Sequence, residues 1–307
     1  MRCVVTGASG FVGRHLLRLL TDHGHTGIAT GRTPPADLPS GWTGMARSDL
    51  LRAASHDCDV VIHLEVKQHV PRPTAADIDT FAAVNVGGTR DWLDWAARND
   101  VRRFVLTSSI KAANPDGPYG QSKARAEEAT REWATADPAR SATILRPAPV
   151  YGPGNEANLA AFVRQVIAGR PCLVGSGRVR KSVVSVGNVA AAIEFAAGRV
   201  EPGCAVFTVT DPATLSLRDL ATLIAELAGS PPPRSIPRLL AQCAAPVGDL
   251  VAALTGREMP LTTARLRALD EASDFSSDDL VAAGFQHPQT TREGLEELVG
   301  SLTPARS

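Results

Sequence analysis

A tyrosine and a lysine four residues apart, Tyr119 and Lys123 in the sequence YGQSK, are the residues best suited to acid–base chemistry. Residues at this spacing share one face of a helix, and a nearby ammonium favours the charged form of a phenol. Lowering the pKa of a phenol by about 3 units requires about 4 kcal/mol, which we expect from Lys123 together with a cationic ring bound in the site. Ser109, at the end of an expected strand, is placed to hold a substrate oxygen beside the phenol. With only two tyrosines and four lysines in the chain, such a pair arises by chance about 3% of the time.

Three glycines predict a second part of the site, a nucleotide-binding turn. Gly7, Gly10 and Gly13 in TGASGFVG follow an expected strand and open an expected helix. This spacing allows a tight turn, close approach of the backbone to a pyrophosphate and close packing of helix on sheet. The helix N-terminus then offers unpaired amides to the phosphates. The alternative is a glycine-rich turn without a ligand, but the strand before it and the helix after it favour dinucleotide binding.

The composition of the 307 residues excludes several classes of protein. The 32 basic and 32 acidic side chains leave no net charge, which argues against nucleic-acid binding. No apolar run approaches the ~18 residues of a membrane span, and the N-terminus lacks the zones of a signal peptide, so we expect a cytoplasmic protein. Five scattered cysteines indicate reduced core residues, and no His, Cys and Asp residues have the spacing of metal ligands. We therefore expect no metal.

The elements that position these residues alternate between apolar runs and amphipathic stretches. The expected strands are 3–6, 27–30, 60–64, 104–107 and 142–145, with helices at 13–23 and 80–99 among them. This alternation predicts an α/β fold with a doubly wound parallel sheet, the Rossmann architecture. We place a dinucleotide-binding domain at 1–150, with 183–210 returning to it, and a smaller C-terminal substrate-binding lobe at 151–182 and 211–307.

The second half of the chain has a different pattern. We expect a helix within 152–171, a basic strand within 178–186, a helix at 189–197, a strand at 205–210 and a helix opened by Ser216. The segment 230–246, SPPPRSIPRLLAQCAAP, is too rich in proline for regular packing, so we expect it to cover or line a cleft.

In their order along the chain, the motifs resemble those of the extended short-chain dehydrogenase/reductases, the superfamily of nucleotide-sugar epimerases and dehydratases. The motifs are TGASGFVG, Asp49-Leu50, VIHL, Asn85-Val-Gly-Gly-Thr89, TSS, YGQSK and Arg146-Pro-Ala-Pro-Val-Tyr-Gly-Pro-Gly154. The segments HVPRPTAAD, TSSIKA, VYGPGNEANL and RVRKSVVSVGNVAAAI are most similar to bacterial UDP-sugar 4-epimerases and 4-ketoreductases that act on N-acetylated hexoses.

The resemblance implies a role for each matching residue. Ser109, Tyr119 and Lys123 would be catalytic, Asp49 and Leu50 would face the adenine, and Leu64 would face the ribose region. The expected cofactor-binding residues are Gly7, Ser9, Gly10, Phe11, Val12, Gly13, Arg32, Asp49, Leu50, Leu64, Asn85, Tyr119 and Lys123. The expected substrate-binding residues are Ser109, Asn158, Arg180, Lys181 and Arg265, with Arg267 as an alternative to Arg265. For residues 180–181 the alternative is a solvated basic turn.

Three departures from the family pattern bear on the reaction. Only ten residues separate Ser109 from Tyr119, a shorter loop than in relatives, which would open the site to a larger or different substrate. Glu65 in HLEV replaces a small residue near the cofactor. Ile110 and Lys111 stand where dehydratases of the superfamily have Asp-Glu, so elimination of water is disfavoured. His63 in the same VIHL motif is interpreted as a satisfied strand residue rather than a catalyst, because Tyr119 and Lys123 already supply the acid–base chemistry.

The helix expected at 80–99 carries apolar residues on two faces. Val86, Thr89, Leu93 and Ala96 form the stripe expected to face the sheet, and Trp92 and Trp95 lie nearly opposite. A helix that is apolar on both faces needs a second partner, and relatives pair this helix in a dimer. We therefore predict a homodimer that buries Trp92 and Trp95; the alternative is coverage by the C-terminal lobe of the same chain.

The end of the second strand predicts which nicotinamide cofactor is used. NAD-selective relatives have a carboxylate there for the ribose 2′-hydroxyl, but this chain has Gly31-Arg32. A guanidinium at Arg32 can pair with a 2′-phosphate, with Arg14 as a second contact, so NADP(H) is favoured over NAD(H). The alternative is that Arg32 points to solvent and either cofactor serves.

Together these residues predict hydride transfer between a nicotinamide and a sugar carbon, at C4 of a UDP- or dTDP-sugar. Preference for NADP(H) favours a nucleotide-sugar 4-ketoreductase. The alternatives are a 4-epimerase that retains NAD, a ketoreductase of a non-nucleotide secondary metabolite, and a non-catalytic cofactor-binding scaffold.

Overall fold

The computed structural model describes residues 1–53, 57–70, 73–155, 158–255, 262–263, 266 and 272–303. Contacts within this part of the chain divide it into two compact units. The first unit comprises Met1–Val150, Val186–Val209 and Ser277–Pro288, and the second comprises Tyr151–Ser185, Thr210–Ser276 and Gln289–Ser307. Each unit has its own apolar core.

The first unit is built on a seven-stranded sheet in the order β11-β6-β5-β4-β1-β2-β3, in which neighbouring strands are parallel. The strands are β1 (Arg2–Thr6), β2 (Thr26–Gly31), β3 (Trp42–Ala46), β4 (Val60–His63), β5 (Arg103–Thr107), β6 (Ser141–Pro147) and β11 (Gly203–Val209). The chain winds outward from β1 to β3 and then from β4 to β11, so the winding direction reverses between β1 and β4. This confirms the predicted doubly wound sheet, and ligands of such sheets bind at the reversal.

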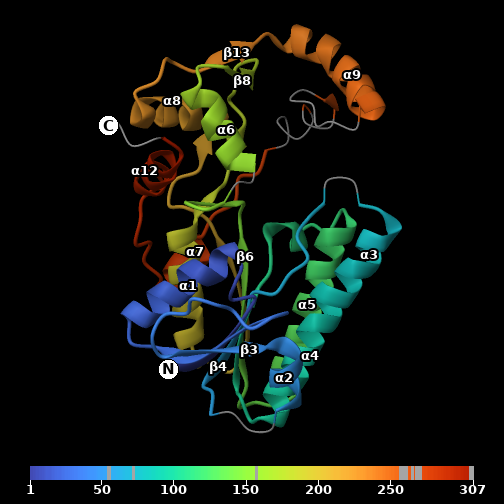
Figure 1. Cartoon of the computed structure of the whole chain (residues 1–307), viewed down its shortest axis with the longest axis vertical. Helices are drawn as coiled ribbons and strands as arrows, with labels where there is room; N and C mark the ends of the chain where they lie inside the picture. Colours follow the sequence, from blue (N-terminus) through green and yellow to red (C-terminus); the bar gives the residue numbers. More distant parts are fainter. Residues whose placement is uncertain are drawn as a thin grey trace. The chain divides into compact units, whose positions relative to one another are not determined.

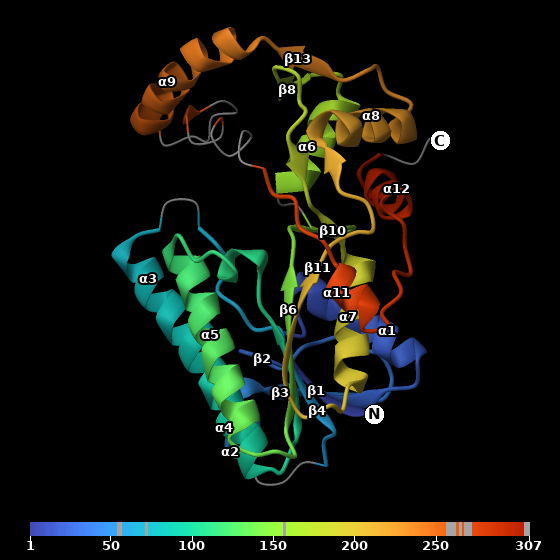
Figure 2. The same ribbon diagram turned by 180° about the vertical axis from the view of Figure 1, so that it is seen from behind.

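Helices cover both faces of this sheet, which explains its apolar strands. Figure 2 shows α1 (Phe11–Asp22), α7 (Val186–Gly198) and α11 (Asp278–Ala282) on one face. The other face carries α2 (Arg47–Arg52), α3 (Ala75–Phe81), α4 (Gly88–Arg98) and α5 (Pro118–Thr135). Two short helices complete the unit, the π-helix η1 (Ala82–Gly87) and the 3-10 helix η2 (Ile110–Ala112).

All five strands predicted in the first 150 residues are present, and one further strand, β3, was missed. Its sequence WTGMA has a central glycine and no apolar run, so it carries little strand signal. The predicted helix at 80–99 begins earlier, at Ala75, because Thr74 and Asp77 form a reciprocal capping box.

The second partner of this helix lies within the chain, which corrects the predicted role of Trp92 and Trp95. Both indoles are 0% exposed and pack edge to face at 5.8 Å. Trp95 Nε1 donates to the carbonyl of Leu50 at 2.9 Å, and Trp92 Nε1 donates to the Glu65 carboxylate at 3.2 Å. Val86, Thr89, Leu93 and Ala96, which form the predicted stripe, are buried as well, so both apolar faces of the helix are covered. These residues belong to the first unit, so neither a dimer nor the C-terminal lobe is needed to bury the indoles.

The second unit is mainly helical (Figure 1). The helices α6 (Asn158–Ile167), α8 (Leu217–Ala228) and α12 (Thr291–Leu302) surround a core that contains Tyr151. Short strands connect them: β7 (Val150–Tyr151), β8 (Pro171–Val174), β9 (Arg180–Lys181), β10 (Val184–Ser185), β12 (Leu215–Ser216) and β13 (Arg234–Ile236). The basic strand predicted at 178–186 is therefore two fragments. Ser216 caps α8 as predicted, because its hydroxyl accepts from the amide of Asp219.

The proline-rich segment is regular, which corrects the expectation for 230–246. Its prolines 231–233 precede β13, and helix α9 (Arg238–Thr255) follows Pro237 directly. A proline beside a helix N-terminus displaces no hydrogen bond, because the first helical amides have no partner within the helix. Pro246 lies inside α9. Within the described residues no helix is long and apolar enough to cross a membrane, and no side-chain group could hold a metal ion.

Candidate active site

The turn between β1 and α1 has no room for side chains at its glycines. Gly7 has a φ of 64°, and a Cβ there would lie 3.0 Å from the backbone of Leu64 and Glu65. A Cβ on Gly13 would lie 2.5 Å from the carbonyl oxygen of Ala8. No side chain caps α1 at Gly10, so its first amides remain available to a ligand. This bare, amide-rich turn fits the pyrophosphate of a dinucleotide.

The adjacent strand ends place the residues expected around the adenosine. Gly31 pairs with Ala46 across β2 and β3, so Arg32 and Arg47 leave neighbouring strands side by side. Arg32 is exposed, and no ion pair or hydrogen bond to it occurs among the described residues. Arg14, the expected second contact, donates to the carbonyl of Ser9 at 2.8 Å and so braces the glycine turn.

Asp49 and Leu50 differ in what they can offer a cofactor. Asp49 is exposed and forms an ion pair with Arg52 at 2.8 Å. The side chain of Leu50 is fully buried in the core, so only its backbone can reach an adenine. The Glu65 carboxylate, unusual for the family at this position, pairs with Arg47 at 3.2 Å, and Arg47 also pairs with Asp91 at 2.6 Å.

His63 holds the end of β4 in a chain of hydrogen bonds. The Thr89 hydroxyl donates to the Asn85 carbonyl at 2.7 Å, so it accepts from His63 Nε2 at 3.2 Å. His63 Nδ1 must then accept from the Thr6 hydroxyl at 2.8 Å. That hydroxyl in turn accepts from the amides of Leu64 and Glu65, each at 3.2 Å. Burial lowers the pKa of His63 to about 3, so it is a neutral structural link.

Asn85, an expected cofactor-binding residue, uses its amide group within the chain. Its Oδ1 accepts from the amide of Lys67 at 2.8 Å, and its Nδ2 donates to the Ser122 hydroxyl at 2.9 Å. Ser122 donates to the carbonyl of Tyr119 at 2.8 Å. Asn85 therefore ties the loop after β4 to the first turn of α5.

Ser109 and Tyr119 are brought together as predicted. Helix α5 begins at Pro118, which places Tyr119 in its first turn, where a side-chain hydrogen bond joins it to Ser109. Burial raises the pKa of the Tyr119 phenol, and the hydrogen bond from Ser109 opposes this rise. Lys123 is not among the causes of this pKa in the protein alone, and the lowering expected from Lys123 together with a bound cationic ring stays a prediction. The phenol therefore holds its proton at neutral pH in the protein alone.

Lys123 lies one turn along α5 and is 2% exposed. Its Nζ donates to the carbonyl of Thr107 at the end of β5, at 2.8 Å. Burial lowers the pKa of this ammonium to about 8, while the carboxylate of Glu127 raises it. The ammonium is thus fixed at the carboxyl edge of the sheet, where a cofactor at the reversal of winding would lie.

A buried ion network beneath Lys123 was missed in the sequence. Glu127 accepts two hydrogen bonds from Arg146, at 2.9 and 2.6 Å, one from Arg131 at 3.0 Å and one from the Ser108 hydroxyl at 2.6 Å. These partners lower the pKa of Glu127 despite its burial. The network joins β5, α5 and β6 below Ser109 and Lys123. A carboxylate on the buried face of α5, four residues after Lys123, was the available signal.

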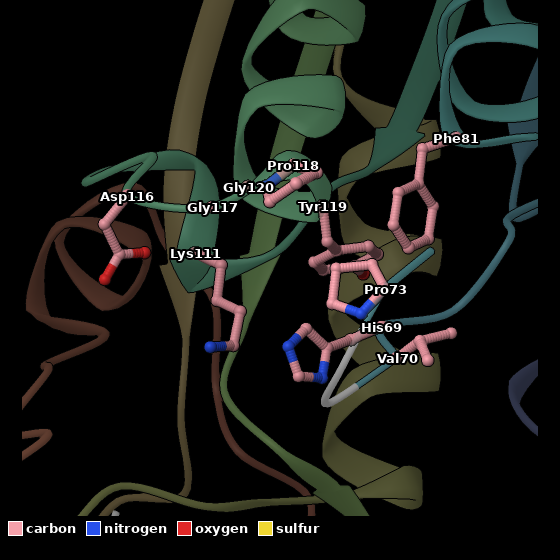
Figure 3. A pocket seen from close by; sticks show the side chains of 10 residues that line it. All are labelled: His69, Val70, Pro73, Phe81, Lys111, Asp116, Gly117, Pro118, Tyr119 and Gly120. Carbon is pink, nitrogen blue, oxygen red and sulfur yellow. The ribbon is translucent and has the colours of Figure 1, made fainter. Parts of the chain in front are cut away.

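A pocket of about 170 Å³ opens beside the phenol (Figure 3). The rings of His69 and Phe81 contact Tyr119 edge to face, at 5.7 and 5.9 Å. Lys111, from the short loop after Ser109, also lines this pocket (Figure 3). Burial, and then the charge of Lys111, lower the pKa of His69. The pocket therefore presents an aromatic wall, the cation of Lys111, the carboxylate of Asp116 and a neutral imidazole to a ligand.

The expected substrate-binding residues beyond Ser109 belong to the second unit or fall outside the described residues. Asn158 begins α6, and Arg180 and Lys181 form β9. The guanidinium of Arg180 pairs with Asp274 at 3.0 Å, and both side chains are half exposed. Arg265 and Arg267 lie outside the described residues.

Comparisons with known proteins agree with this geometry. The family model described as the NAD dependent epimerase/dehydratase family matches residues 3–206. An Escherichia coli O157:H7 protein, N-acetyl-alpha-D-glucosaminyl-diphospho-ditrans,octacis-undecaprenol 4-epimerase, is 28% identical over 95% of this chain and 92% of its own length. A Stigmatella aurantiaca protein, 4-hydroxy-2-methyl-3-oxo-4-farnesyl-3,4-dihydroquinoline-1-oxide ketoreductase, is 28% identical over 81% of this chain and 80% of its own length.

Solved structures show the same fold. That of MoeE5 in complex with UDP-glucose and NAD has a TM-score of 0.71 at 23% identity and covers 98% of each chain. Structures similar to this chain hold NAD in some cases and NADPH in others. With the family model matching about two thirds of its length, the chain belongs to the NAD-dependent epimerase/dehydratase family and is an enzyme of the extended short-chain dehydrogenase/reductase type.

Proposed function

We propose that the chain is a nicotinamide-dependent 4-ketoreductase of a sugar carried on a diphosphate, with a UDP- or dTDP-sugar as the first candidate. The state of Tyr119 carries this proposal. Burial raises the pKa of the Tyr119 phenol, so the phenol carries its proton at neutral pH and can act, beside Ser109, as the general acid that reduction of a ketone requires. A 4-epimerase with retained NAD, the main alternative, must first remove a proton from a carbinol.

The chain's residues divide the work of this reaction. The bound nicotinamide would supply a hydride to the carbonyl carbon. Tyr119 would give its phenolic proton to the carbonyl oxygen, and Ser109 would hold that oxygen beside the phenol. Lys123, anchored on Thr107 at 2.8 Å, would place its positive charge near the phenolate that results. A proton from solvent then restores the phenol, so one ketone becomes one carbinol in each turnover.

Replacing Tyr119 by Phe tests the catalytic assignment. We expect kcat to fall by about 10²–10⁴-fold, while the dissociation constant of the cofactor stays within a factor of two or so. The aromatic packing on His69 and Phe81 is kept in this variant, so it should fold. Near-normal turnover of the variant would overturn the assignment of Tyr119, whereas cofactor binding without any turnover by the wild type would favour a non-catalytic scaffold.

For the cofactor we propose NADP(H), supported by Arg32 at a strand end that carries no carboxylate. Arg32→Ala should weaken NADP(H) binding about tenfold, as loss of one charge-assisted contact predicts, and leave NAD(H) binding nearly unchanged. Arg18→Ala, an exposed arginine on α1, is the matched control. Tighter binding of NAD by the wild type, or NAD co-purifying in near-stoichiometric amount, would instead favour the retained-NAD epimerase.

A polyprenyl diphosphate is a second candidate carrier of the sugar. The relative aligned over 95% of the chain is named for a sugar on diphospho-undecaprenol. A carrier of this kind shares its diphosphate with a UDP-sugar and differs in the group beyond it. Comparing turnover of UDP-N-acetylglucosamine with that of a polyprenyl-diphosphate N-acetylglucosamine, each oxidised at C4, separates the two. A ketone without any sugar diphosphate serving better than both would point to the secondary-metabolite alternative.

The homodimer remains a proposal that rests on family resemblance. Helices α4 and α5 expose charged side chains, among them Arg90, Asp94, Arg125 and Glu128. A dimer through these helices would depend on ion pairs and weaken with salt. A mass measurement at low and high ionic strength tests it, and a monomer at both would exclude this interface.

A further inference from the structure

In its first ten residues, helix α9 exposes three large apolar side chains and buries two alanines. Leu239, Leu240 and Val247 are 76%, 62% and 60% exposed. Ala241 and Ala245 are buried at 0% and 1%, in a small cluster with Leu266. An amphipathic helix in a globular protein shows the reverse arrangement.

The exposed apolar residues form one continuous face. At about 100° per residue, Leu239, Cys243, Val247, Leu240 and Ala244 fall within an arc of about 140°. No charged side chain lies in this arc, since Arg238 and Asp249 are the only charged residues of α9 and both fall outside it. Large apolar faces on soluble domains mark surfaces that bind other molecules.

The chemistry of this face fits a lipid surface better than a protein partner. A protein interface of ordinary size carries about one hydrogen bond per 100–200 Å², and among the five residues of this face only Cys243 has a polar hydrogen, which is a weak donor. At the start of the helix, Arg234 and Arg238 are exposed and basic, which complements anionic headgroups. An apolar helical face flanked by arginines is the pattern of helices that lie in the plane of a membrane.

We propose that α9 docks the protein on an anionic bilayer, with the face of Leu239, Leu240, Cys243, Ala244 and Val247 in the headgroup–acyl boundary. This inference rests on the proposed function with a polyprenyl diphosphate as the carrier of the sugar. A polyprenyl chain stays in the bilayer, so only an enzyme held at that surface meets its diphosphate repeatedly. The helix lies on the membrane and does not cross it.

Flotation with vesicles of phosphatidylglycerol and phosphatidylethanolamine tests the docking without any need for turnover. The full-length wild type should float with the vesicles, and less so in high salt. Leu240→Gln together with Val247→Ser should reduce the bound fraction at least tenfold, because two apolar side chains leave the lipid. Both positions are exposed, so the fold should persist. Val200→Ser, 68% exposed in the first unit, is the matched control and should bind like the wild type.

Four outcomes are decisive. Failure of the wild type to float would overturn the proposal. Concentration-dependent dimers that the double variant disperses, without vesicle binding, would assign the face to a second copy of the chain. If the proposal is right, the double variant keeps its turnover of soluble sugar ketones and loses turnover only of the lipid-linked ketone in vesicles. If the wild type binds vesicles but reduces no sugar ketone, the docking proposal stands and only the proposed function is overturned.

Discussion

Helices α5 and α9 each contain 18 residues, and both depart from the usual amphipathic pattern, but in opposite directions. Helix α5 buries charged residues, Lys123 and Glu127, at 2% and 0% exposure, whereas α9 exposes leucines. The buried carboxylate of α5 is matched by Arg146, Arg131 and Ser108. On α9 no described residue covers the exposed side chains. The buried charges of α5 have partners within the chain and support the proposed active site, whereas the exposed leucines of α9 lack such partners among the described residues and form the proposed docking surface.

The largest effect is expected where the matching in α5 is broken. Glu127→Gln removes a buried carboxylate and leaves the half-buried guanidinium of Arg146 without its charged partner, so it should lower the free energy of unfolding by about 3–5 kcal/mol. Glu128→Gln, at the neighbouring position and 65% exposed, should change it by less than about 0.5 kcal/mol. Urea unfolding of both variants measures the difference. Equal stability of the two would mean that the network contributes nothing beyond a surface ion pair.

A pH dependence distinguishes the buried ammonium of α5 from ordinary lysines. The folded pKa of Lys123, about 8, lies below its ordinary 10.5, so the unfolded chain binds the proton more tightly. Stability of the wild type is therefore lost as pH falls through 8 and regained toward 10.5. Relative to Lys123→Met, which has no such proton, the wild type should gain about 2–3 kcal/mol between about pH 7 and 10.

Lys111→Met, at an exposed lysine, is the control for this experiment and should show no comparable change between the two pH values. Unfolding free energies of the wild type and both variants are needed at each pH. A constant difference between the wild type and Lys123→Met would contradict a lowered pKa.

Smaller effects on stability are expected on α9. Here enlarging a buried alanine should destabilise the protein, whereas replacing an exposed leucine by a polar residue should not. Ala245→Leu forces a large side chain into the closely packed inner face and should cost about 1–3 kcal/mol. Leu240→Gln, on the outer face, should change stability by less than about 0.5 kcal/mol. Thermal unfolding of the two variants shows which face of α9 is more sensitive to substitution. A destabilising Leu240→Gln would show that protein covers the outer face in solution.

Patterns confined to a few neighbouring residues were readable in the sequence. The glycine turn at residues 7–13 and the five apolar strands depend on local backbone geometry, and the structure contains them. Ser109 and Tyr119 meet because a strand end and a helix start must lie at the same edge of a parallel sheet. The four-residue spacing between Tyr119 and Lys123 likewise predicted that both lie on one helix, and both lie on α5.

What the sequence could not reveal depends on residues far apart in the chain. Trp95 is satisfied by the carbonyl of Leu50, and no helical period predicts a partner 45 positions away. The pKa of Tyr119 follows from its burial, which periodicity does not measure. Proline content misled for 230–246, because Pro237 precedes a helix where a proline displaces no hydrogen bond.

The all-parallel sheet has a consequence for the synthesis of the protein. Strand β6 pairs on one side with β5, which precedes it, and on the other with β11, made roughly 55 residues later. At about 5–20 residues per second, the ribosome leaves this apolar edge unpaired for about 3–11 s. An exposed strand edge in a nascent chain is a template for aggregation. The growing chain therefore passes through a period in which chaperone protection of β6 would govern yield, whatever the stability of the finished fold.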